Sequence, residues 1–425
     1  MRFVYLFLGL LVTGLLGGLG CKPHAPTKPP TVTPPPIATH PTKFGMPRWV
    51  FPRRSGLRFP EVIIAAPVAN QNHVYVLTSD SYLYAIDFNG DVSWRWPPNS
   101  MKNKPQQVRM QPVLSPDGQT IFLGTERNYL YALNTAGQTL WKEPSWLPGS
   151  LNITPMVTKQ RIYVSLPGIF KALDYQGQAL WSYSTTNRPT FRTAARYLDG
   201  TLYLTDKKGY LHVLAKKPIP GQAKGQQCGN ITKHSAQATP PQYCARKKFC
   251  DQITTPPTLN PVNKTVYFGC QNGKVFAVNE KLEEEWAFES KGPILTRPVT
   301  NTDGSQLYTS SDDKKLYAIQ TSDGSESWSF KSGEYKKDAQ NNFSEDPTEQ
   351  SVMYIKAPVT LDSIKRLYVG SINHFTHVLT PKGKLVWQYK LDGWMEYSPL
   401  YIYNASLRRG TLFVVTARRL YAFNF

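Results

Sequence analysis

The sequence repeats a short phrase that ends in tryptophan. It reads LYAIDFNGDVSW at residues 83–94, LYALNTAGQTLW at 130–141, FKALDYQGQALW at 170–181 and LYAIQTSDGSESW at 316–328. In each copy an alternating apolar segment leads into a polar turn with a glycine, and a second segment then ends at the tryptophan. Alternation with a period of two, bounded by Gly, Asn and Asp, is typical of β-strands joined by tight turns. The phrase therefore predicts the last two strands of a repeating β unit.

Two further strands precede the phrase in each unit. The first lies beside a proline, as in AAPV at 65–68, and the second is an alternating segment such as VYVLT at 74–78. Four strands that recur about every 40–50 residues form one blade of a propeller. Eight such second segments are present. The fold class is therefore predicted as all-β, an eight-bladed propeller of four-stranded antiparallel blades over residues 46–425.

The last unit, LFVVTARRLYAFNF at 412–425, has no fourth strand and no tryptophan. MPRWVFPRRSG at 46–56 is similar to the fourth strand in GKLVWQYKLDG at 383–393, but no third strand precedes it. We therefore expect this N-terminal strand to complete the last blade and close the ring, which removes exposed sheet edges.

The repeated phrase, Ala-x-Asp-x-x-x-Gly-x-x-x-Trp, resembles the repeat of the pyrroloquinoline-quinone (PQQ) propeller superfamily. AIQTSDGSESW at 318–328 has its eleven-residue spacing. In that family the tryptophan docks between adjacent blades, where an indole can bury about 150–250 Å² and still pair its N–H. The resemblance implies a structural role between blades for Trp49, Trp94, Trp141, Trp181, Trp286, Trp328 and Trp387.

Two inserts interrupt the repeat. Residues 218–252 replace the tryptophan strand of the fourth blade, so that strand is either degenerate or supplied by the insert. Residues 332–351 join the sixth blade to the seventh. Long loops on a rigid scaffold often carry binding function, although a tolerated surface insertion is the alternative.

Four cysteines follow the N-terminal region: Cys228, Cys244, Cys250 and Cys270. An even number in an exported chain predicts two disulfides, of which one from the insert to Cys270 would pin the insert to the ring. Free thiols and a zinc site are the alternatives, but no Cys-x-x-Cys is present.

The N-terminus predicts export. Arg2 precedes an apolar run that ends at Cys21, so residues 1–20 are interpreted as a signal peptide. A Cys directly after GLG resembles a bacterial lipoprotein signal, which implies a lipid anchor on Cys21; simple secretion and an uncleaved anchor are the alternatives. Residues 21–45 are rich in Pro and Thr and are interpreted as a tether. These features predict an outer-membrane lipoprotein facing the periplasm, or else a secreted or periplasmic protein.

The net charge of +20 favours anionic partners. Residues near the prolines of the first strands are candidates to line the central channel: Arg109, Gln111, Arg192, Arg297, Lys356 and Glu396. A basic channel could hold an anionic ligand, and a solvated channel with paired charges is the alternative. The basic cluster ARKKFC at 245–250 is interpreted in the same two ways, as a contact for lipid phosphates or as a solvated surface.

One branch of the PQQ superfamily contains quinoprotein dehydrogenases that bind PQQ and calcium. This chain has neither an adjacent Cys-Cys pair nor a Cys-x-x-Cys-His motif. We therefore expect no enzyme activity, no PQQ, no calcium and no other metal.

The other branch is the BamB family of outer-membrane β-barrel assembly lipoproteins, which are non-catalytic scaffolds. Similarity to that branch implies a periplasmic or outer-membrane protein partner such as the barrel-assembly insertase, a monomeric state and no nucleic acid. The alternative function is an extracytoplasmic propeller that binds a ligand or glycan, and a PQQ-dependent dehydrogenase is less expected.

Overall fold

The computed structural model describes residues 45–424 except 53–61, 100, 102–107, 109, 150, 152, 186–190, 192–195, 199, 221–227, 339, 341, 345 and 405–408. Residues 44–425 form one compact unit, distinct from residues 1–43. The expected signal peptide, Cys21 and all but the last residue of the expected tether lie outside the described residues.

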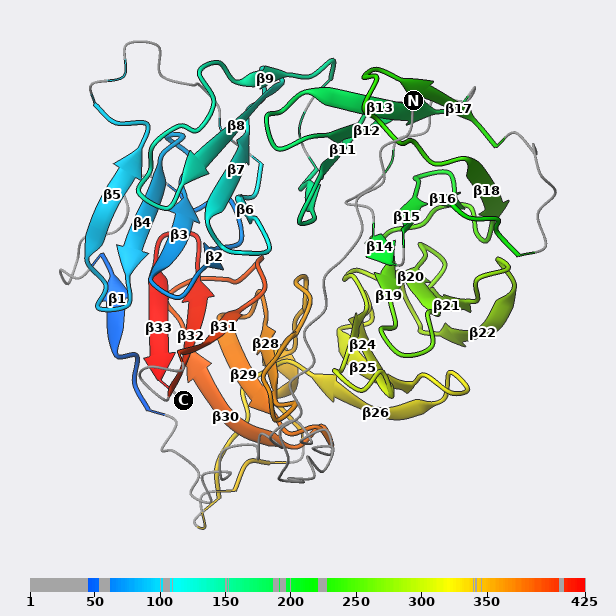
Figure 1. Ribbon diagram of the computed structural model, residues 1–425. Helices are drawn as coiled ribbons and strands as arrows, with labels where there is room; N and C mark the ends of the chain where they lie inside the picture. Colours follow the sequence, from blue (N-terminus) through cyan, green and yellow to red (C-terminus); the bar gives the residue numbers. More distant parts are fainter. Residues whose placement is uncertain are drawn as a thin grey trace, which may run out of the picture. The chain divides into compact units, whose positions relative to one another are not determined.

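The compact unit is an eight-bladed propeller (Figure 1). Blade 1 comprises β2 (Val68–Ala69), β3 (His73–Leu77), β4 (Leu83–Asp87) and β5 (Val92–Trp96). Blade 2 comprises β6 (Val113–Leu114), β7 (Thr120–Gly124), β8 (Tyr129–Asn134) and β9 (Ser145–Trp146). Blade 3 comprises β10 (Met156–Val157), β11 (Ile162–Leu166), β12 (Ile169–Leu173), β13 (Ala179–Ser184) and a fifth strand, β17 (Asn230–Lys233).

Blade 4 comprises β14 (Arg196–Leu198), β15 (Thr201–Thr205), β16 (Tyr210–Ala215) and β18 (Tyr243–Lys248). Blade 5 comprises β19 (Thr258–Leu259), β20 (Val266–Gly269), β21 (Lys274–Val278) and β22 (Glu284–Glu289). Blade 6 comprises β23 (Val299–Thr300), β24 (Gln306–Ser310), β25 (Lys315–Gln320) and β26 (Glu326–Lys331). Blade 7 comprises β27 (Thr360–Leu361), β28 (Leu367–Gly370), β29 (Phe375–Leu379) and β30 (Leu385–Lys390), preceded by the 3₁₀-helix η1 (Glu349–Ser351).

Blade 8 joins the two ends of the propeller. Its strands are β31 (Leu400–Asn404), β32 (Arg409–Val415), β33 (Leu420–Asn424) and β1 (Trp49–Phe51). The N-terminal β1 pairs antiparallel with β33, and Trp49 lies opposite Ala422. The predicted ring closure is therefore confirmed, as is the fold class.

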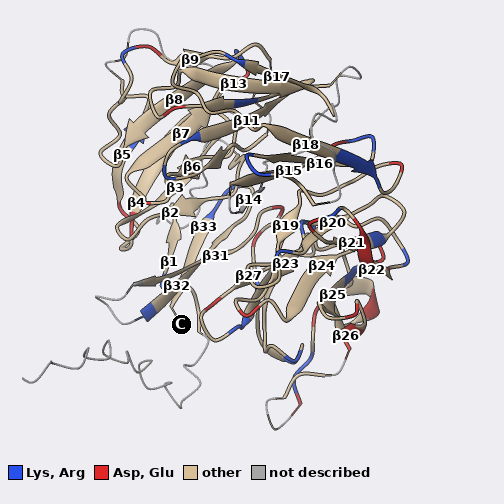
Figure 2. Ribbon diagram, turned by 45° about the vertical axis from the view of Figure 1, so that its right-hand side comes forward, with Lys and Arg blue, Asp and Glu red and all other residues tan. Residues whose placement is uncertain are grey.

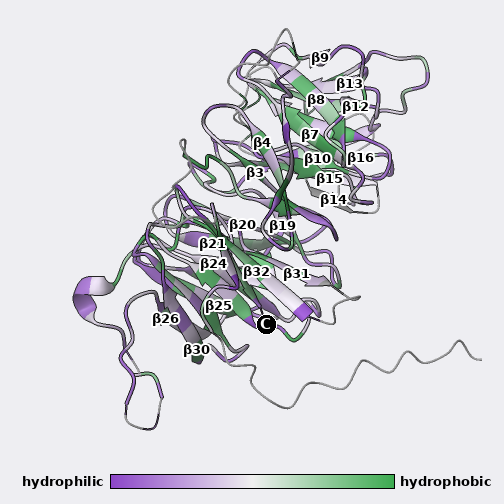
Figure 3. Cartoon of the chain, turned by 90° about the vertical axis from the view of Figure 1, so that its left-hand side faces the viewer, coloured by the Kyte–Doolittle hydropathy of each residue, from purple (hydrophilic) through white to green (hydrophobic). Residues whose placement is uncertain are grey.

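The core is divided among the interfaces between blades. The described residues contain eight hydrophobic clusters, and each one is shared by two adjacent blades. The second and third strands are covered on both faces and are almost wholly buried, as in β11, whereas β22 exposes alternate residues. Figure 3 shows the same contrast, with apolar inner strands and polar outer loops. Alternation therefore marks the half-covered outer strands, whereas the inner strands are continuous apolar runs.

Three blades depart from the repeat. The insert at 218–252 supplies both β18, the fourth strand of blade 4, and β17, the extra outer strand of blade 3. The fourth strand of blade 2 begins only at Ser145, so Trp141 precedes it and the expected placement of Trp141 on that strand is wrong. Pro144 stands just before the strand and cannot donate a ladder hydrogen bond, which accounts for the late start.

Candidate functional site

The tryptophans connect each blade to the next through a single type of contact. In five of them the indole Nε1 donates over 2.8–3.1 Å to a backbone carbonyl in the turn between the third and fourth strands of the following blade. The pairs are Trp49 to Phe88, Trp94 to Thr135, Trp141 to Tyr175, Trp286 to Thr321 and Trp328 to Pro381. These side chains pack adjacent blades together, which confirms for these five the structural role that the resemblance implied.

The turn glycine makes the contact possible. Gly324 has φ +78°, and a Cβ added there would lie 2.6 Å from Cε3 of Trp286. The indole therefore lies flat against a turn that only a residue without a side chain can form. This explains why the glycine and the tryptophan occur together in the repeated phrase.

Trp387 and Trp181 are the other two tryptophans expected between blades. Trp387 packs edge-on against Phe423 at 5.1 Å, near the end of the last blade. Trp181 is 1% exposed, and its Nε1 has no hydrogen-bond partner in the described part of the chain. In blade 4, which follows Trp181, the insert begins where the turn would lie.

The fourth blade compensates for its missing tryptophan with a lysine. Lys247 of β18 donates from Nζ over 2.9 Å to the carbonyl of Leu282, in the turn that follows β21. An indole N–H makes this type of bond at the five interfaces above. Figure 2 shows the resulting basic character of β18 beside the acidic β22. The cluster ARKKFC thus forms a strand, with exposed Arg246, Lys247 and Lys248 on it.

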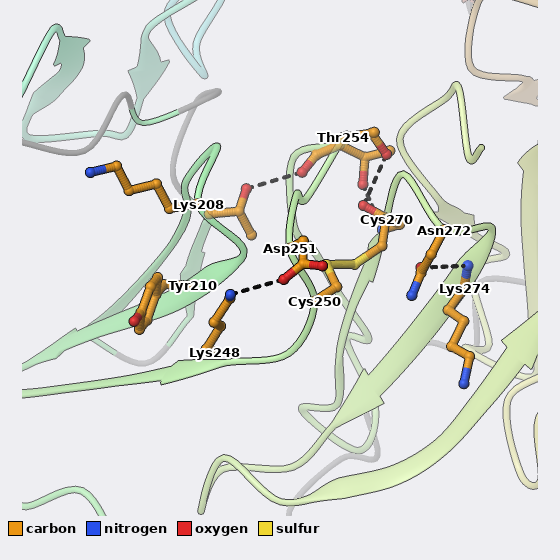
Figure 4. Close-up of a disulfide and its surroundings, with 12 residues drawn as sticks. Lys208, Tyr210, Lys248, Cys250, Asp251, Thr254, Cys270, Asn272 and Lys274 are labelled. Atoms are coloured by element: carbon orange, nitrogen blue, oxygen red, sulfur yellow. Dashed lines mark hydrogen bonds and ion pairs between the residues drawn. A yellow bond between two sulfur atoms is a disulfide. The ribbon is translucent and has the colours of Figure 1, made fainter.

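Two disulfides hold the first insert in place. Cys228 pairs with Cys244 inside the insert, and Cys250 pairs with Cys270. Cys270 directly follows β20, so the second bond ties the insert to blade 5 (Figure 4). An exposed ion pair of 2.9 Å between Lys248 and Asp251 lies beside it. The predictions of two disulfides and of a bond from the insert to Cys270 are confirmed, and the structure shows which cysteines pair.

A buried polar chain joins blades 3 and 4. His212 lies 2.9 Å from Oδ2 of Asp206 through Nε2 and 3.1 Å from the hydroxyl of Tyr183 through Nδ1. Burial alone would raise the pKa of Asp206, but the hydrogen bond from His212 and two from backbone N–H groups lower it overall. All three side chains are buried, so these hydrogen bonds join the two blades inside their interface.

The second insert, 332–351, has an anchored base and an exposed tip. Nε2 of the buried His377 lies 2.9 Å from the carbonyl oxygen of Gly333. Gln388 of β30 exchanges two hydrogen bonds with the backbone of the buried Tyr335. In the tip, residues 336–346, the described residues are mostly exposed and include Lys336 and Lys337. The second insert is therefore a loop whose first residues are fixed to blade 7 by hydrogen bonds and whose tip extends into solvent.

Each insert walls a pocket between two blades. One pocket, of about 400 Å³, lies between blades 6 and 7; Phe343 and Asp346 of the insert line it together with Lys315 and Lys384. The other, of about 380 Å³, lies between blades 3 and 4; Thr239 of the insert lines it together with Trp181, Arg161 and Lys216. Neither pocket was predicted from the sequence. The one signal for the second pocket was the absence of a tryptophan strand in blade 4.

The channel candidates are only partly described. Arg109 and Arg192 lie outside the described residues. Gln111 and Arg297 are half-buried, and Lys356 and Glu396 are exposed, each a few residues before a first strand. Burial lowers the pKa of Arg297. No hydrogen bond or ion pair joins these four among the described residues, so a shared anion site in the channel stays a prediction.

The described residues offer neither a metal-binding cluster nor a membrane-spanning helix. No group of three or more His, Cys, Asp or Glu side chains lies close enough to hold a metal ion in this part of the chain. Within the same residues no helix has the length and apolar character that crossing a membrane requires.

Comparison with known families identifies the repeat. The family model described as outer membrane protein assembly factor BamB matches residues 56–146 and 112–330, more than half of the chain. The chain belongs to the BamB family. The predicted resemblance to PQQ-like propellers close to BamB is thereby confirmed.

Solved structures agree on the fold of this BamB family member. The crystal structure of BamB from Moraxella catarrhalis has a TM-score of 0.59 at 15% identity, over 87% of this chain and 96% of that one. The computationally designed Ika8 protein has a TM-score of 0.62 at 12% identity, over 90% of this chain and 100% of that one. No curated protein matches the sequence. At these sequence identities the two structures support the fold and nothing further.

Proposed function

We propose that this protein is a non-catalytic scaffold of the bacterial envelope that binds a protein partner in outer-membrane protein assembly. The match to the family model of assembly factor BamB across residues 56–330 carries the proposal. The propeller gives such a role a rigid frame, because its tryptophans join blade to blade and its ends are tied in blade 8. The two insert-walled surfaces offer places where a partner could dock.

The disulfides support an oxidising compartment. Cys228–Cys244 and Cys250–Cys270 fit a periplasmic or exported protein, because cytosolic thiols are generally kept reduced. We further propose that Cys21 is lipidated and tethers the propeller to the outer membrane. Metabolic labelling with a radioactive fatty acid tests this: Cys21→Ser should lose the label, and a label that persists would refute it.

The second insert is the better target for mapping the partner. Deleting residues 218–252 would remove β18 and both disulfides, so loss of binding would only report misfolding. Replacing residues 336–346 with a Gly-Ser linker leaves Tyr335 and its bonds to Gln388 in place. A second variant, Lys336→Glu with Lys337→Glu, reverses the charge of the exposed tip and removes the cation–π contact of Lys337 with Phe343.

The experiment is cross-linking in native envelopes followed by purification of the protein in mild detergent. The wild-type chain should recover a barrel-insertase complex, and both tip variants should recover less of it. Lys142→Glu with Lys281→Glu, on exposed sites of blades 2 and 5 away from both insert-walled pockets, is the control for a general loss of positive charge. Recovery of no outer-membrane protein by the wild-type chain would overturn the assembly role. Undiminished recovery by both tip variants would instead exclude the tip as the docking site.

The same proposal expects no PQQ and no calcium. Adding both to the purified protein should produce neither the absorbance of bound quinone nor dye-linked dehydrogenase activity. Saturable activity that requires both additions would replace the scaffold with a quinoprotein enzyme.

A further inference from the structure

The interface between blades 3 and 4 lacks a turn that other interfaces possess. At five interfaces the carbonyl that accepts from the indole stands one or two residues after the third strand of the next blade. In blade 4 the third strand, β16, ends at Ala215, so the matching residues are Lys216 and Lys217. The chain then continues through Pro218 into the insert instead of turning back at a glycine.

Where this turn is missing, the indole N–H of Trp181 has no acceptor among the described residues, and a pocket lies beside the indole. Trp181 is buried, and its Nε1 has no partner within the described residues. Trp181 also lines the pocket of about 380 Å³ between these blades, and so does Lys216. A buried N–H without a partner is destabilising, so an acceptor that reaches it from outside gains a hydrogen bond without breaking one in the protein.

The wall of the pocket is cationic. Arg161 donates from Nη2 over 2.9 Å to Oγ1 of Thr239, and Lys216 donates from Nζ over 3.2 Å to the same oxygen. Lys159 also lines the pocket, and the described lining residues include no Asp or Glu. Two cations thus converge on one neutral hydroxyl, an arrangement that a carboxylate would stabilise.

We propose that this pocket binds an acidic peptide segment of a partner protein. A backbone carbonyl of the segment accepts from Nε1 of Trp181, as a turn carbonyl of the next blade does at five other interfaces. A carboxylate of the segment lies between Arg161 and Lys216. A peptide is favoured over a small anion because the pocket adjoins Lys216, and the matching residues at the five other interfaces belong to a peptide turn. All residues of this site belong to the one chain, so the proposal holds whichever protein is the assembly partner.

The test follows the Trp181 N–H directly by NMR of the full chain labelled with ¹⁵N-tryptophan, and the Trp181→Phe variant assigns its signal. The probe is the peptide EELDYQGQ with blocked ends. Its last six residues copy residues 173–178 of this chain, the turn whose Tyr175 carbonyl accepts from Trp141. The matched neutral probe is QQLNYQGQ, in which Asn also replaces the Asp of the copied turn, and sodium acetate is the small-anion probe.

We expect the acidic peptide to move the Trp181 N–H proton downfield in a saturable manner. Trp181→Phe should weaken peptide binding roughly tenfold, about the worth of one buried hydrogen bond. The exposed Lys216→Gln should weaken the acidic peptide more than the neutral one. Trp94→Phe is the control and should leave the affinity unchanged, because that N–H already donates to Thr135.

Three results would overturn the proposal. The Trp181 signal could stay in place at millimolar peptide, or Trp181→Phe could bind as tightly as the wild-type chain. Acetate alone could also produce the full shift, which would make the site a simple anion site. Each result is separate from the envelope cross-linking experiment, which reports on the partner and not on this pocket.

Discussion

Gly324→Ala tests the reasoning that links the glycine and the tryptophan of the repeat. Gly324 adopts φ +78°, a conformation that costs an L-residue about 1–2 kcal/mol. The added Cβ would also lie 2.6 Å from Cε3 of Trp286, and overpacking of this kind costs roughly 1–3 kcal/mol. Together the two effects predict a loss of about 2–5 kcal/mol in the free energy of unfolding.

Gly118→Ala separates the two effects. Gly118 has φ +69°, but its added Cβ would meet nothing closer than Cβ of Asn70 at 3.4 Å, so only the backbone cost of about 1–2 kcal/mol is expected. Urea unfolding followed by circular dichroism measures both variants. In a Trp286→Ala background the cost of Gly324→Ala should fall to that of Gly118→Ala, a coupling of about 1–3 kcal/mol. Equal costs in the wild-type background, or an excess that survives removal of the indole, would refute the docking argument.

Three further predictions concern stability. Replacing Cys250 and Cys270 with alanine should cost about 3 kcal/mol, the loop-closure value for a separation of 20 residues, as measured by urea unfolding of the oxidised chain. Burial lowers the pKa of His377 to about 4 from 6.5, so the neutral form is favoured in the folded state. Stability from this group is complete above pH 6.5 and should fall by about 3 kcal/mol as the pH drops toward 4. His377→Gln should flatten the pH profile of the melting temperature in that window, whereas the exposed His234→Gln should not. Deleting residues 46–52 should leave β33 with an open edge and produce oligomers in light scattering, and a monomer would contradict the role of β1.

The repeat made the propeller predictable from sequence because each blade carries the same local signals. Alternation, turn glycine and tryptophan agree at residues 83–94 and again at 316–328, so errors in one copy are corrected by the others. Ring closure was predictable for a related reason, since the strand missing after residue 425 is present at Trp49.

The pockets were not predictable because they arise where the repeat fails. The sequence shows that blade 4 lacks its tryptophan strand, but not that the insert would supply β18 and β17 to two different blades. Only the three-dimensional arrangement brings Thr239 to Arg161 across 78 residues of sequence. In the same way, the fixed base of the second insert depends on His377 of a later strand.

The pairing of β1 with β33 has a consequence for the order of synthesis. Trp49 and Ala422 are partners, yet β33 is made after every other strand of the propeller. Bringing together strands about 370 residues apart costs roughly 5 kcal/mol in chain entropy, which the earlier blades reduce as they assemble. Until that strand emerges, β1 has no partner, and a chain interrupted at any earlier point keeps β1 unpaired. Only a chain translated through β33 can therefore pair β1, and until then the backbone edge of the first strand stays available to other molecules.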